Sequence, residues 1–382
     1  MSIYLDYNAS APIEPRVISV MTDVYTNNIG NPDSRTHSFG EDTNKILSNA
    51  RDKVASLLNV NKAEIIFTSG ATESNNIALQ GLMEYGIKSN KKHILTTSIE
   101  HKSILETVKY MGLHGFEIEM INPETDGRID PDKLLKRVRK DTLLVCVMHA
   151  NNETGIIQPV EIIGNELKTR NILFLIDITQ TCGKLVEEIQ NLKYDMLSFS
   201  AHKLRGPQGI GVLILKKKHY KYPPVKPIMF GGGQEHGFSP GTVPVALAAG
   251  LGKACEIALA EYKENALKTT AIKHEILNLL NKSGITYKIN GNQNHCLSTT
   301  LNVSIMGVSS EALMLSTKQY CGISNGSACS ASSYEPSYVL KAMNLPKEQI
   351  ESALRISWGP ETNIEELKNN FGKLLEVAKA MV

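Results

Sequence analysis

In the stretch DMLSFSAHKLRGPQGIGVLILK, residues 195–216, two short apolar runs flank a turn that is rich in glycine. Continuously apolar runs of this length are typical of strands that are buried on both faces of a sheet. Lys203 lies directly after the first run. The stretch therefore predicts two neighbouring strands of a buried sheet, with a lysine at the end of the first.

The same pattern extends outward toward the N-terminus, from about residue 45 to about residue 215. Four further apolar runs share it: EIIF (64–67), HILTT (93–97), LLVCVM (143–148) and ILFLI (172–176). Stretches with the period of amphipathic helices alternate with these runs, and such alternation predicts an α/β domain with a largely parallel sheet. Residues 243–283 are almost wholly helix-like, so we expect a long helix that leads to a second domain.

The totals exclude several classes of protein. A chain of 382 residues with 42% hydrophobic and 21% charged residues is typical of a soluble globular protein with more than one domain. A net charge of +2 gives no bulk electrostatic reason to bind nucleic acid or a membrane surface. No apolar run is long enough to span a bilayer, and the N-terminus has no secretory signal pattern.

The six cysteines are scattered and none shows C-x-x-C spacing. In a chain of this length, that pattern indicates reduced thiols rather than disulfides or a zinc site. We therefore expect a cytoplasmic protein with no metal, no membrane partner and no direct contact with nucleic acid.

Compact polar sequences follow five of the predicted strands. They are TSGATES (68–74), SIEH (98–101), ANNETG (150–155), DITQ (177–180) and SAHK (200–203). Ligands of open parallel sheets bind outside the carboxyl ends of the strands. We therefore expect these five sequences to assemble one site.

Each polar group also has an ordinary structural interpretation. Lys203 is compatible with a surface lysine, Asp177 and residues 69–72 with helix caps, and His101 with a core histidine. The functional interpretation is chemical. A partly desolvated Lys203 can form a Schiff base, Asp177 can pair with a protonated ring nitrogen, and the turn at 69–72 can bind phosphate at a helix N-terminus. Taken together, in this order, these groups form the set that pyridoxal phosphate requires.

Over nearly its whole length the sequence resembles the cysteine desulfurases of the class V aminotransferase group, which have PLP fold type I. The matching motifs include YLDYNASAP (4–12), FTSGATESNN (67–76), EHKSIL (100–105), NNETG (151–155), SAHKLRGPQGIG (200–211), GGGQE (231–235), PGT (240–242), NGSACS (325–330), EPSYVL (335–340) and RIS (355–357).

The resemblance implies a large PLP-binding α/β domain over residues 15–255, with a mostly parallel seven-stranded sheet flanked by helices. It implies a smaller α+β domain, made of residues 1–14 and 256–382. That smaller domain is expected to carry the mobile loop of the catalytic cysteine, at about residues 321–334.

The resemblance also implies a role for each matching residue. Lys203 is the lysine that binds the cofactor covalently, and His101 stacks on the cofactor ring. Asp177 is the partner of the ring nitrogen, and Gln180 contacts the ring hydroxyl. Cys329 is the nucleophile that takes the sulfur.

Further residues are implied to hold the phosphate and the substrate. The phosphate cradle is expected to consist of Ala71, Thr72, Ser200 and His202. Thr242 matches a phosphate ligand that is donated by the other subunit, which implies a homodimer. Asn152 and Arg355 match the pair that binds the substrate carboxylate, and a guanidinium suits that task because it meets a carboxylate bidentately.

The implied reaction removes sulfur from L-cysteine, leaves L-alanine, and passes a persulfide on Cys329 to an acceptor protein. The acceptor stays open between an iron–sulfur cluster scaffold, a tRNA-thiolation protein and a DNA-sulfur modification system. A selenocysteine lyase or an aminotransferase on the same fold is an alternative, as is a sulfur carrier without catalysis.

Four positions depart from the family pattern. His236 and Ser239 stand where arginines are usual, and Arg205 and Gln208 replace an aromatic residue and a lysine. These departures leave open how charge is distributed near the phosphate.

Overall fold

The computed structural model describes residues 2–326 and 336–382, so Cys329 lies outside the described residues. In that part of the chain the main sheet has seven strands in the order β2-β8-β7-β6-β5-β3-β4. Their bounds are β2 (Ile65–Thr68), β3 (His93–Thr97), β4 (Glu117–Ile121), β5 (Thr142–Met148), β6 (Leu173–Asp177), β7 (Met196–Ser200) and β8 (Gly211–Leu215). Only β8 runs antiparallel to its neighbours. The predicted mostly parallel seven-stranded sheet is confirmed.

The apolar runs identify every strand of this sheet except β4. That strand, EIEMI, lies at the edge of the sheet and pairs only with β3. Its residues are exposed or half-buried. An edge strand therefore lacks the continuous apolar run that marks the central strands.

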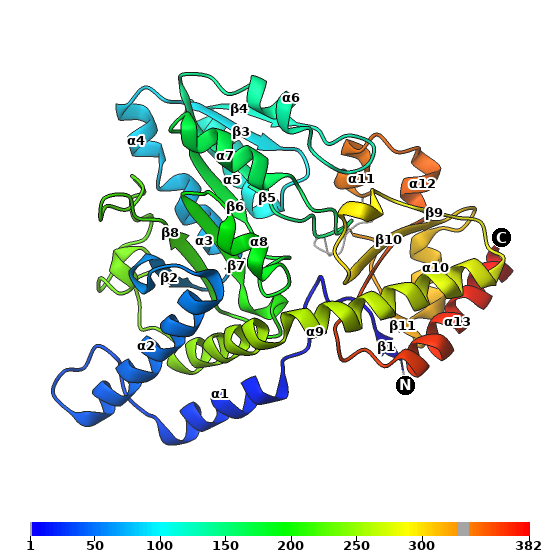
Figure 1. Cartoon of the computed structure of the whole chain (residues 1–382), viewed down its shortest axis with the longest axis horizontal. Coiled ribbons are helices and arrows are strands. Elements are labelled where there is room, and N and C mark those ends of the chain that lie inside the picture. The colour runs from blue at the N-terminus through cyan, green and yellow to red at the C-terminus, as the bar shows by residue number, and fades with distance from the viewer. Residues whose placement is uncertain (1, 327–335) are drawn as a thin grey trace.

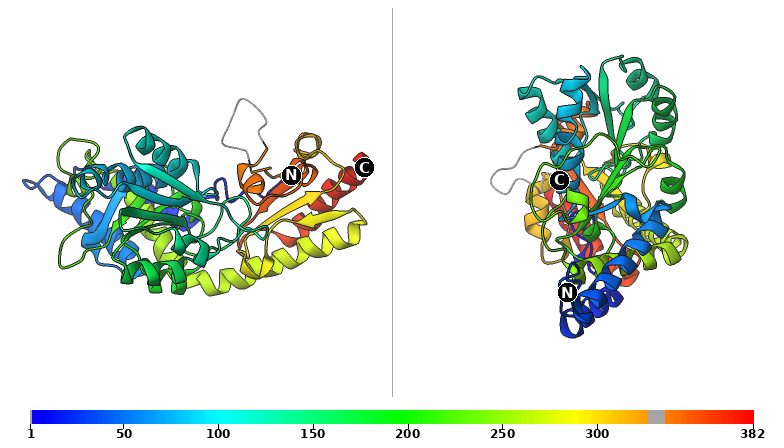
Figure 2. Two further views of the ribbon diagram at one scale, coloured as in Figure 1. Left: turned by 90° about the horizontal axis from the view of Figure 1, so that it is seen from above. Right: turned by 90° about the vertical axis from the view of Figure 1, so that its left-hand side faces the viewer.

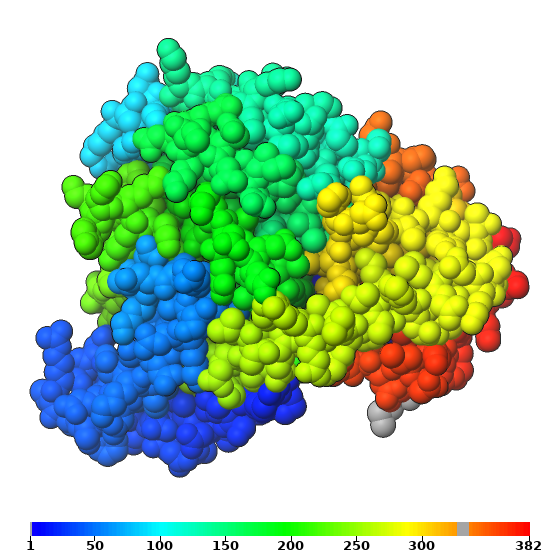
Figure 3. Space-filling model, viewed as in Figure 1, coloured from blue at the N-terminus to red at the C-terminus, as the bar shows by residue number. Residues whose placement is uncertain are grey.

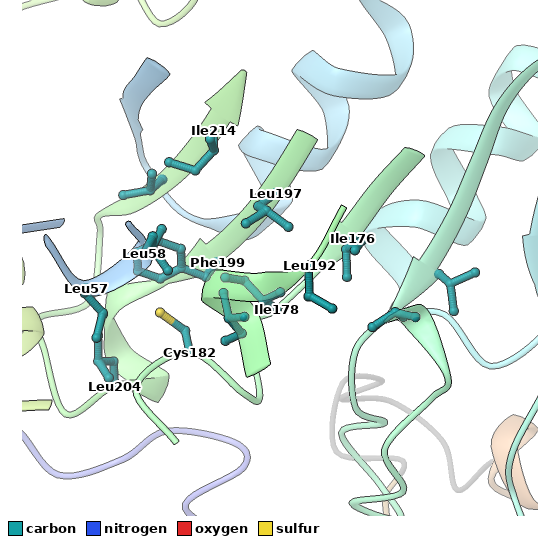
Figure 4. Close-up of a cluster of buried hydrophobic side chains, with 14 of the residues drawn as sticks. Leu57, Leu58, Ile176, Ile178, Cys182, Leu192, Leu197, Phe199, Leu204 and Ile214 are labelled. Atoms are coloured by element: carbon teal, nitrogen blue, oxygen red, sulfur yellow. The ribbon is translucent and has the colours of Figure 1, made fainter. Parts of the chain in front are cut away.

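Helices cover both faces of the sheet (Figure 1). The helices of this region are α1 (Pro15–Asn27), which packs on α9, and α2 (Ser38–Leu58), α3 (Ala71–Gln80), α4 (Met83–Lys88), α5 (Lys102–Leu113), α6 (Pro131–Lys136), α7 (Val160–Thr169), α8 (Val186–Asn191) and α9 (Val245–Ser283). Alternate strand residues point to opposite faces. Ile176 and Leu197 therefore pack with α2, α7, α8 and α9, as Figure 4 shows in part, whereas Leu175 and Met196 pack with α3 and α5.

The long helix α9 runs from the main sheet to a second hydrophobic cluster (Figures 1 and 2). Leu251 and Cys255 belong to the first cluster, and Ile272 and Ile276 to the second. The predicted domain boundary after residue 255 thus falls inside one helix, and the division into domains stays a prediction.

The second cluster is built around an antiparallel sheet in the order β12-β10-β9. The elements of this region are β1 (Ile3–Tyr4), β9 (Tyr287–Ile289), β10 (Thr300–Ile305), α10 (Ser310–Thr317), β11 (Cys321–Gly322), α11 (Tyr338–Ala342), α12 (Lys347–Glu351), β12 (Ala353–Ser357) and α13 (Ile364–Met381). Strand β1 pairs with β11, so the N-terminal segment joins the C-terminal part of the chain.

Among the described residues, no helix combines the length and the apolar character that crossing a membrane requires.

Candidate active site

The carboxyl ends of β2, β3, β5, β6 and β7 lie at one edge of the main sheet because these strands run in the same direction. Lys203 follows β7 on a short 3₁₀ turn, η2 (Ala201–Lys203). Its Nζ donates to the backbone carbonyls of Asn8 and Ala9, each at 2.5 Å. The N-terminal segment therefore reaches the lysine from the other side of the site.

Asp177, at the end of β6, is held by a network centred on Asn75. Asp177 is only 4% exposed. Its Oδ2 accepts from Asn75 Nδ2 at 3.1 Å, and its Oδ1 accepts from the Thr179 backbone N–H at 2.9 Å. Asn75 also donates to Ser103 Oγ and accepts from Ser198 Oγ. Asn75 is therefore a positioning residue that the sequence analysis missed, although it lies within the motif FTSGATESNN.

His101 is both an N-cap and a neighbour of the charged groups. Its Nδ1 accepts from the Ser103 backbone N–H at 3.1 Å at the start of α5. Burial lowers the pKa of His101; the Asp177 carboxylate opposes this shift, and the Lys203 charge adds to it. The ring is therefore neutral near pH 7. Because Nδ1 accepts a hydrogen bond, Nε2 carries the proton.

The predicted phosphate residues surround one cavity of about 320 Å³. It is lined by Ala9, Ser10, Ser69, Gly70, Ala71, Thr72, Ser200, His202, Gln208 and Gly209, and we call it the cradle. Helix α3 begins here at Ala71, and helix N-termini favour anions. Ser200 Oγ accepts from the Ala71 backbone N–H at 2.7 Å, which ties β7 to this helix. Burial lowers the pKa of His202 to about 4, so its ring is neutral at pH 7.

Several buried polar atoms beside the cradle have no hydrogen-bond partner within the described residues. They are Gln180 Oε1, Asn152 Oδ1 and Thr179 Oγ1. Gln180 is otherwise anchored, since its Nε2 donates to the Asn8 carbonyl at 3.2 Å. Leaving such atoms without a partner costs free energy, so their clustering indicates a polar ligand. With the cradle for phosphate and Asp177 for a ring nitrogen, the residues present fit pyridoxal phosphate.

Arg355 on β12 is brought next to Asn152, as the resemblance implied. The Arg355 side chain is buried, and its Nη1 donates to the Asn152 carbonyl at 3.2 Å. Its Nη2 forms an ion pair with Asp6 Oδ1 at 2.7 Å. Asp6 was not among the predicted site residues, and no local sequence signal links positions so far apart. A substrate carboxylate at Arg355 would compete with Asp6.

The two flanks of the segment that carries Cys329 converge on Glu153. Ser337 Oγ donates to Glu153 Oε2 at 2.5 Å. A Cβ at Gly326 would lie 2.4 Å from the same oxygen. Burial raises the pKa of Glu153 to about 7, although the Ser337 bond and the nearby Arg355 charge oppose the shift. The role of Cys329 itself stays a prediction because it lies outside the described residues.

Thr242 does not line the cradle of its own chain. It lines a neighbouring hollow of about 290 Å³ that shares Ser69 and Gly209 with the cradle. Its assignment to the partner's phosphate site remains a prediction.

Ser239 and His236, which stand where the family has arginines, are both placed by the structure. Ser239 Oγ donates to Glu73 Oε1 at 2.8 Å, and Glu73 Oε2 accepts from the Ser69 backbone N–H at 2.6 Å. The ring of His236 packs beside Tyr222, with 5.9 Å between the centroids. A neutral hydroxyl thus supports the loop of the cradle through Glu73.

The other two departures from the family pattern, Arg205 and Gln208, lie in different surroundings. Arg205 forms ion pairs with Glu14 at 2.6 Å and with Glu361 at 3.2 Å. Gln208 lines the cradle, and its Nε2 donates to Ser10 Oγ at 3.2 Å. Of these two positions, only Gln208 therefore lines the predicted phosphate site.

This arrangement of lysine, carboxylate and cradle on a mostly parallel sheet can be compared with known proteins. Residues 3–369 match the family Aminotransferase class-V. The chain belongs to this family.

Its relatives include the cysteine desulfurase IscS of Pasteurella multocida, which is 40% identical over 99% of this chain and 95% of that protein. IscS of Anaeromyxobacter sp. strain K is 39% identical over 96% of the chain and 89% of that protein. Among solved structures, a NifS-like protein matches all of both chains with a TM-score of 0.91 and 35% identity. SspA in complex with cysteine matches with a TM-score of 0.82 and 33% identity, over 95% of this chain and all of that one. The predictions that the protein is a cysteine desulfurase, that it has the PLP fold type I and that it depends on pyridoxal phosphate are confirmed.

Proposed function

We propose that the protein removes sulfur from L-cysteine at the carboxyl edge of its main sheet, with Lys203 as the covalent anchor of pyridoxal phosphate and Cys329 as the sulfur acceptor. One observation carries the proposal. Lys203 and Gln180 both donate to the carbonyl of Asn8, which precedes the cradle residue Ala9, and among the described residues Gln180 Oε1 and Asn152 Oδ1 have no partner. Together with the Asp177 network, this donor set matches pyridoxal phosphate. The similarity to a protein solved in complex with cysteine supports the choice of substrate.

When bound, pyridoxal phosphate supplies an electron sink that acidifies the Cα–H bond of an amino acid. Asp177 would hold a proton on the ring nitrogen, and Asn75 and the Thr179 backbone N–H keep its carboxylate oriented. The cradle and the N-terminus of α3 would bind the phosphate. His101 would present its Nε2–H because Nδ1 is occupied by Ser103.

Lys203 is the group that we assign to proton transfer at the substrate Cα. Its amine lies 2.5 Å from two carbonyl oxygens, and these acceptors would hold it beside the site after it is released. Arg355 and Asn152 would bind the substrate carboxylate. The Asp6 carboxylate would have to share or release Arg355 at that step.

Cys329 completes the reaction in this proposal. Its thiolate attacks the sulfur of L-cysteine, so a bond between the two sulfurs forms as the substrate Cβ–S bond breaks. The electron pair of that bond stays with the carbon, which takes up a proton and leaves as L-alanine. Cys329 then carries a persulfide for an acceptor protein. A homodimer, in which Thr242 completes the partner's phosphate site, is part of the same proposal.

The test replaces Cys329 with alanine and follows two signals. We expect the C329A variant to keep the visible absorbance of bound cofactor and to lose alanine release from L-cysteine. Sustained alanine release by C329A would contradict the role of Cys329. A requirement for a keto acid would favour an aminotransferase, and a strong preference for selenocysteine would favour a lyase.

A further inference from the structure

A second cavity, of about 300 Å³, lies on the other side of Lys203 from the cradle lining. We call it the rear cavity. Lys203 lines it, but none of His101, Asp177, Asn152 and Gln180 does. Most of its wall is apolar and comes from Leu185, Leu204, Ala254, Ile257, Ala258 and Trp358. Figure 3 shows a hollow here, between the green surface of the main sheet region and the yellow surface that follows α9.

Lys184 places a charged group in this apolar cavity. Within the described residues, its amine has no hydrogen-bond or ion-pair partner, and burial lowers its pKa to about 8. The Lys203 charge contributes a smaller part of this lowering of the pKa. Lys184 is half-buried against this apolar wall, and a partly desolvated ammonium is costly unless it is paired, so the amine lacks the counter-charge that would stabilise it.

Among the described residues, one carboxylate lines the rear cavity, and it is already paired. Glu14 lies 2.6 Å from Arg205 and 2.7 Å from Arg16. The Lys203 amine is held by the carbonyls of Asn8 and Ala9, so Lys184 is left as the amine without a counter-charge among the described residues that line the cavity. An apolar wall with a single available amine matches a ligand that has one negative charge and an apolar body.

The walls of the rear cavity belong to segments that also build the candidate active site. Tyr7 precedes Asn8, whose carbonyl accepts from Lys203 and from Gln180. Lys184 lies four residues after Gln180. A ligand in the rear cavity would thus touch the chain directly behind the groups that hold Lys203.

We propose that the rear cavity binds a small monocarboxylate with an apolar tail, with the carboxylate on Lys184 and the tail against α9. A phosphate or a dicarboxylate suits it less, because apolar side chains form most of the wall. The proposal does not rest on the proposed desulfurase reaction, and its test does not use turnover.

The test measures binding of hexanoate to the cofactor-loaded enzyme by isothermal titration calorimetry. Because one hydrogen bond to a charged group is lost, we expect Lys184→Met to weaken hexanoate binding roughly ten- to a hundredfold. The matched control is Lys193→Met, since Lys193 is exposed and does not line the cavity. Hexylamine should bind far more weakly than hexanoate. Equal affinities for hexanoate in K184M and the wild-type protein, or no binding to the wild-type protein, would overturn the proposal.

Two further measurements keep the proposal testable if K184M does not fold. Ala258→Phe places a ring in the cavity and should abolish hexanoate binding. In the wild-type protein, hexanoate should protect Lys184, but not Lys193, from acetylation by acetic anhydride, as read by mass spectrometry. Unchanged labelling of Lys184 at saturating hexanoate would refute the site.

The affinity should also fall as pH rises through about 8, because Lys184 then loses its proton. The other ionisable residues that line the cavity are Tyr7, Glu14, Cys182, Lys203, Arg205, Tyr262 and Cys296. Burial raises the pKa of Tyr7, Cys182 and Cys296, and these groups stay neutral at pH 8. A pH dependence that persists in K184M would assign the effect to another group and contradict the proposal.

Discussion

The cradle and the rear cavity have similar sizes, about 320 and 300 Å³, but opposite character. The cradle is lined by hydroxyls, backbone and a helix N-terminus, whereas the rear cavity is lined mainly by apolar side chains. The short turn η2 separates them, because His202 lines the cradle and Lys203 lines the rear cavity. Polar groups therefore gather where the strands of the main sheet end, whereas apolar groups gather where α9 crosses between the two hydrophobic clusters.

The largest effect is expected for Lys203→Ala, which removes the residue between the two cavities. We expect turnover of L-cysteine to fall at least about a thousandfold, because both the covalent anchor and a proton-transfer group are lost. The cradle should still bind pyridoxal phosphate without a covalent bond. Absorbance spectra before and after borohydride, together with alanine release, measure both points.

If the cofactor became permanently attached to K203A on treatment with borohydride, another amine would be the covalent anchor. Lys184 is the first alternative to test, because its lowered pKa makes it nucleophilic.

The second-largest effect on turnover is expected for Asn75→Ala, because Asn75 holds Asp177 in place. Asp177 Oδ2 would lose its 3.1 Å bond, so we expect turnover to fall about ten- to a hundredfold. The pH at which the bound cofactor changes absorbance should shift, a readout that general destabilisation does not move. Retained wild-type turnover in N75A would show that the Thr179 backbone N–H alone orients Asp177.

Ser200→Ala tests the cradle itself. The Ala71 backbone N–H would lose its 2.7 Å acceptor, and the phosphate would lose a hydroxyl. We expect the dissociation constant for pyridoxal phosphate to rise about tenfold, because a hydrogen bond to a charged group is lost. Hexanoate binding in the rear cavity should not change. A variant that weakens both ligands equally would mean that the two cavities are not independent.

The smallest effect is expected for the stability of Lys184→Met. The Lys184 pKa falls from 10.5 to about 8 on folding, so the unfolded chain binds more protons between these pH values. The cost of the buried charge is therefore fully present below about pH 8 and fades as pH rises toward 10.5. K184M removes that cost, and we expect it to be more stable than the wild-type protein by about 1 kcal/mol at pH 7.

Urea unfolding at pH 7 and pH 10 measures this difference. The difference in free energy of unfolding between K184M and the wild-type protein should be smaller at pH 10 than at pH 7. A difference of the same size at both pH values would show that packing, rather than charge, accounts for it.

The local pattern of the sequence was enough to predict six strands of the main sheet and the residues at their ends. Buried central strands require continuous apolar runs, and polar groups follow the strand ends, so the positions of Lys203, Asp177 and the strand-end residues of the cradle follow from the sequence alone. The cradle residues Ala9 and Ser10 do not. The edge strand β4 was not predicted, because its exposed and half-buried residues form no continuous apolar run.

How distant segments of the chain meet became visible only in the folded structure. Asp6 and Arg355 are 349 residues apart and form an ion pair, and the carbonyls of Asn8 and Ala9 hold an amine that lies 195 and 194 residues further along the chain. The rear cavity exists because α9, the N-terminal segment and the strand β12 region close around Lys184. The spacing of hydrophobic residues along an element indicates which of its faces is buried. It carries no information on which other element covers that face, because the covering element is determined only when the whole chain packs.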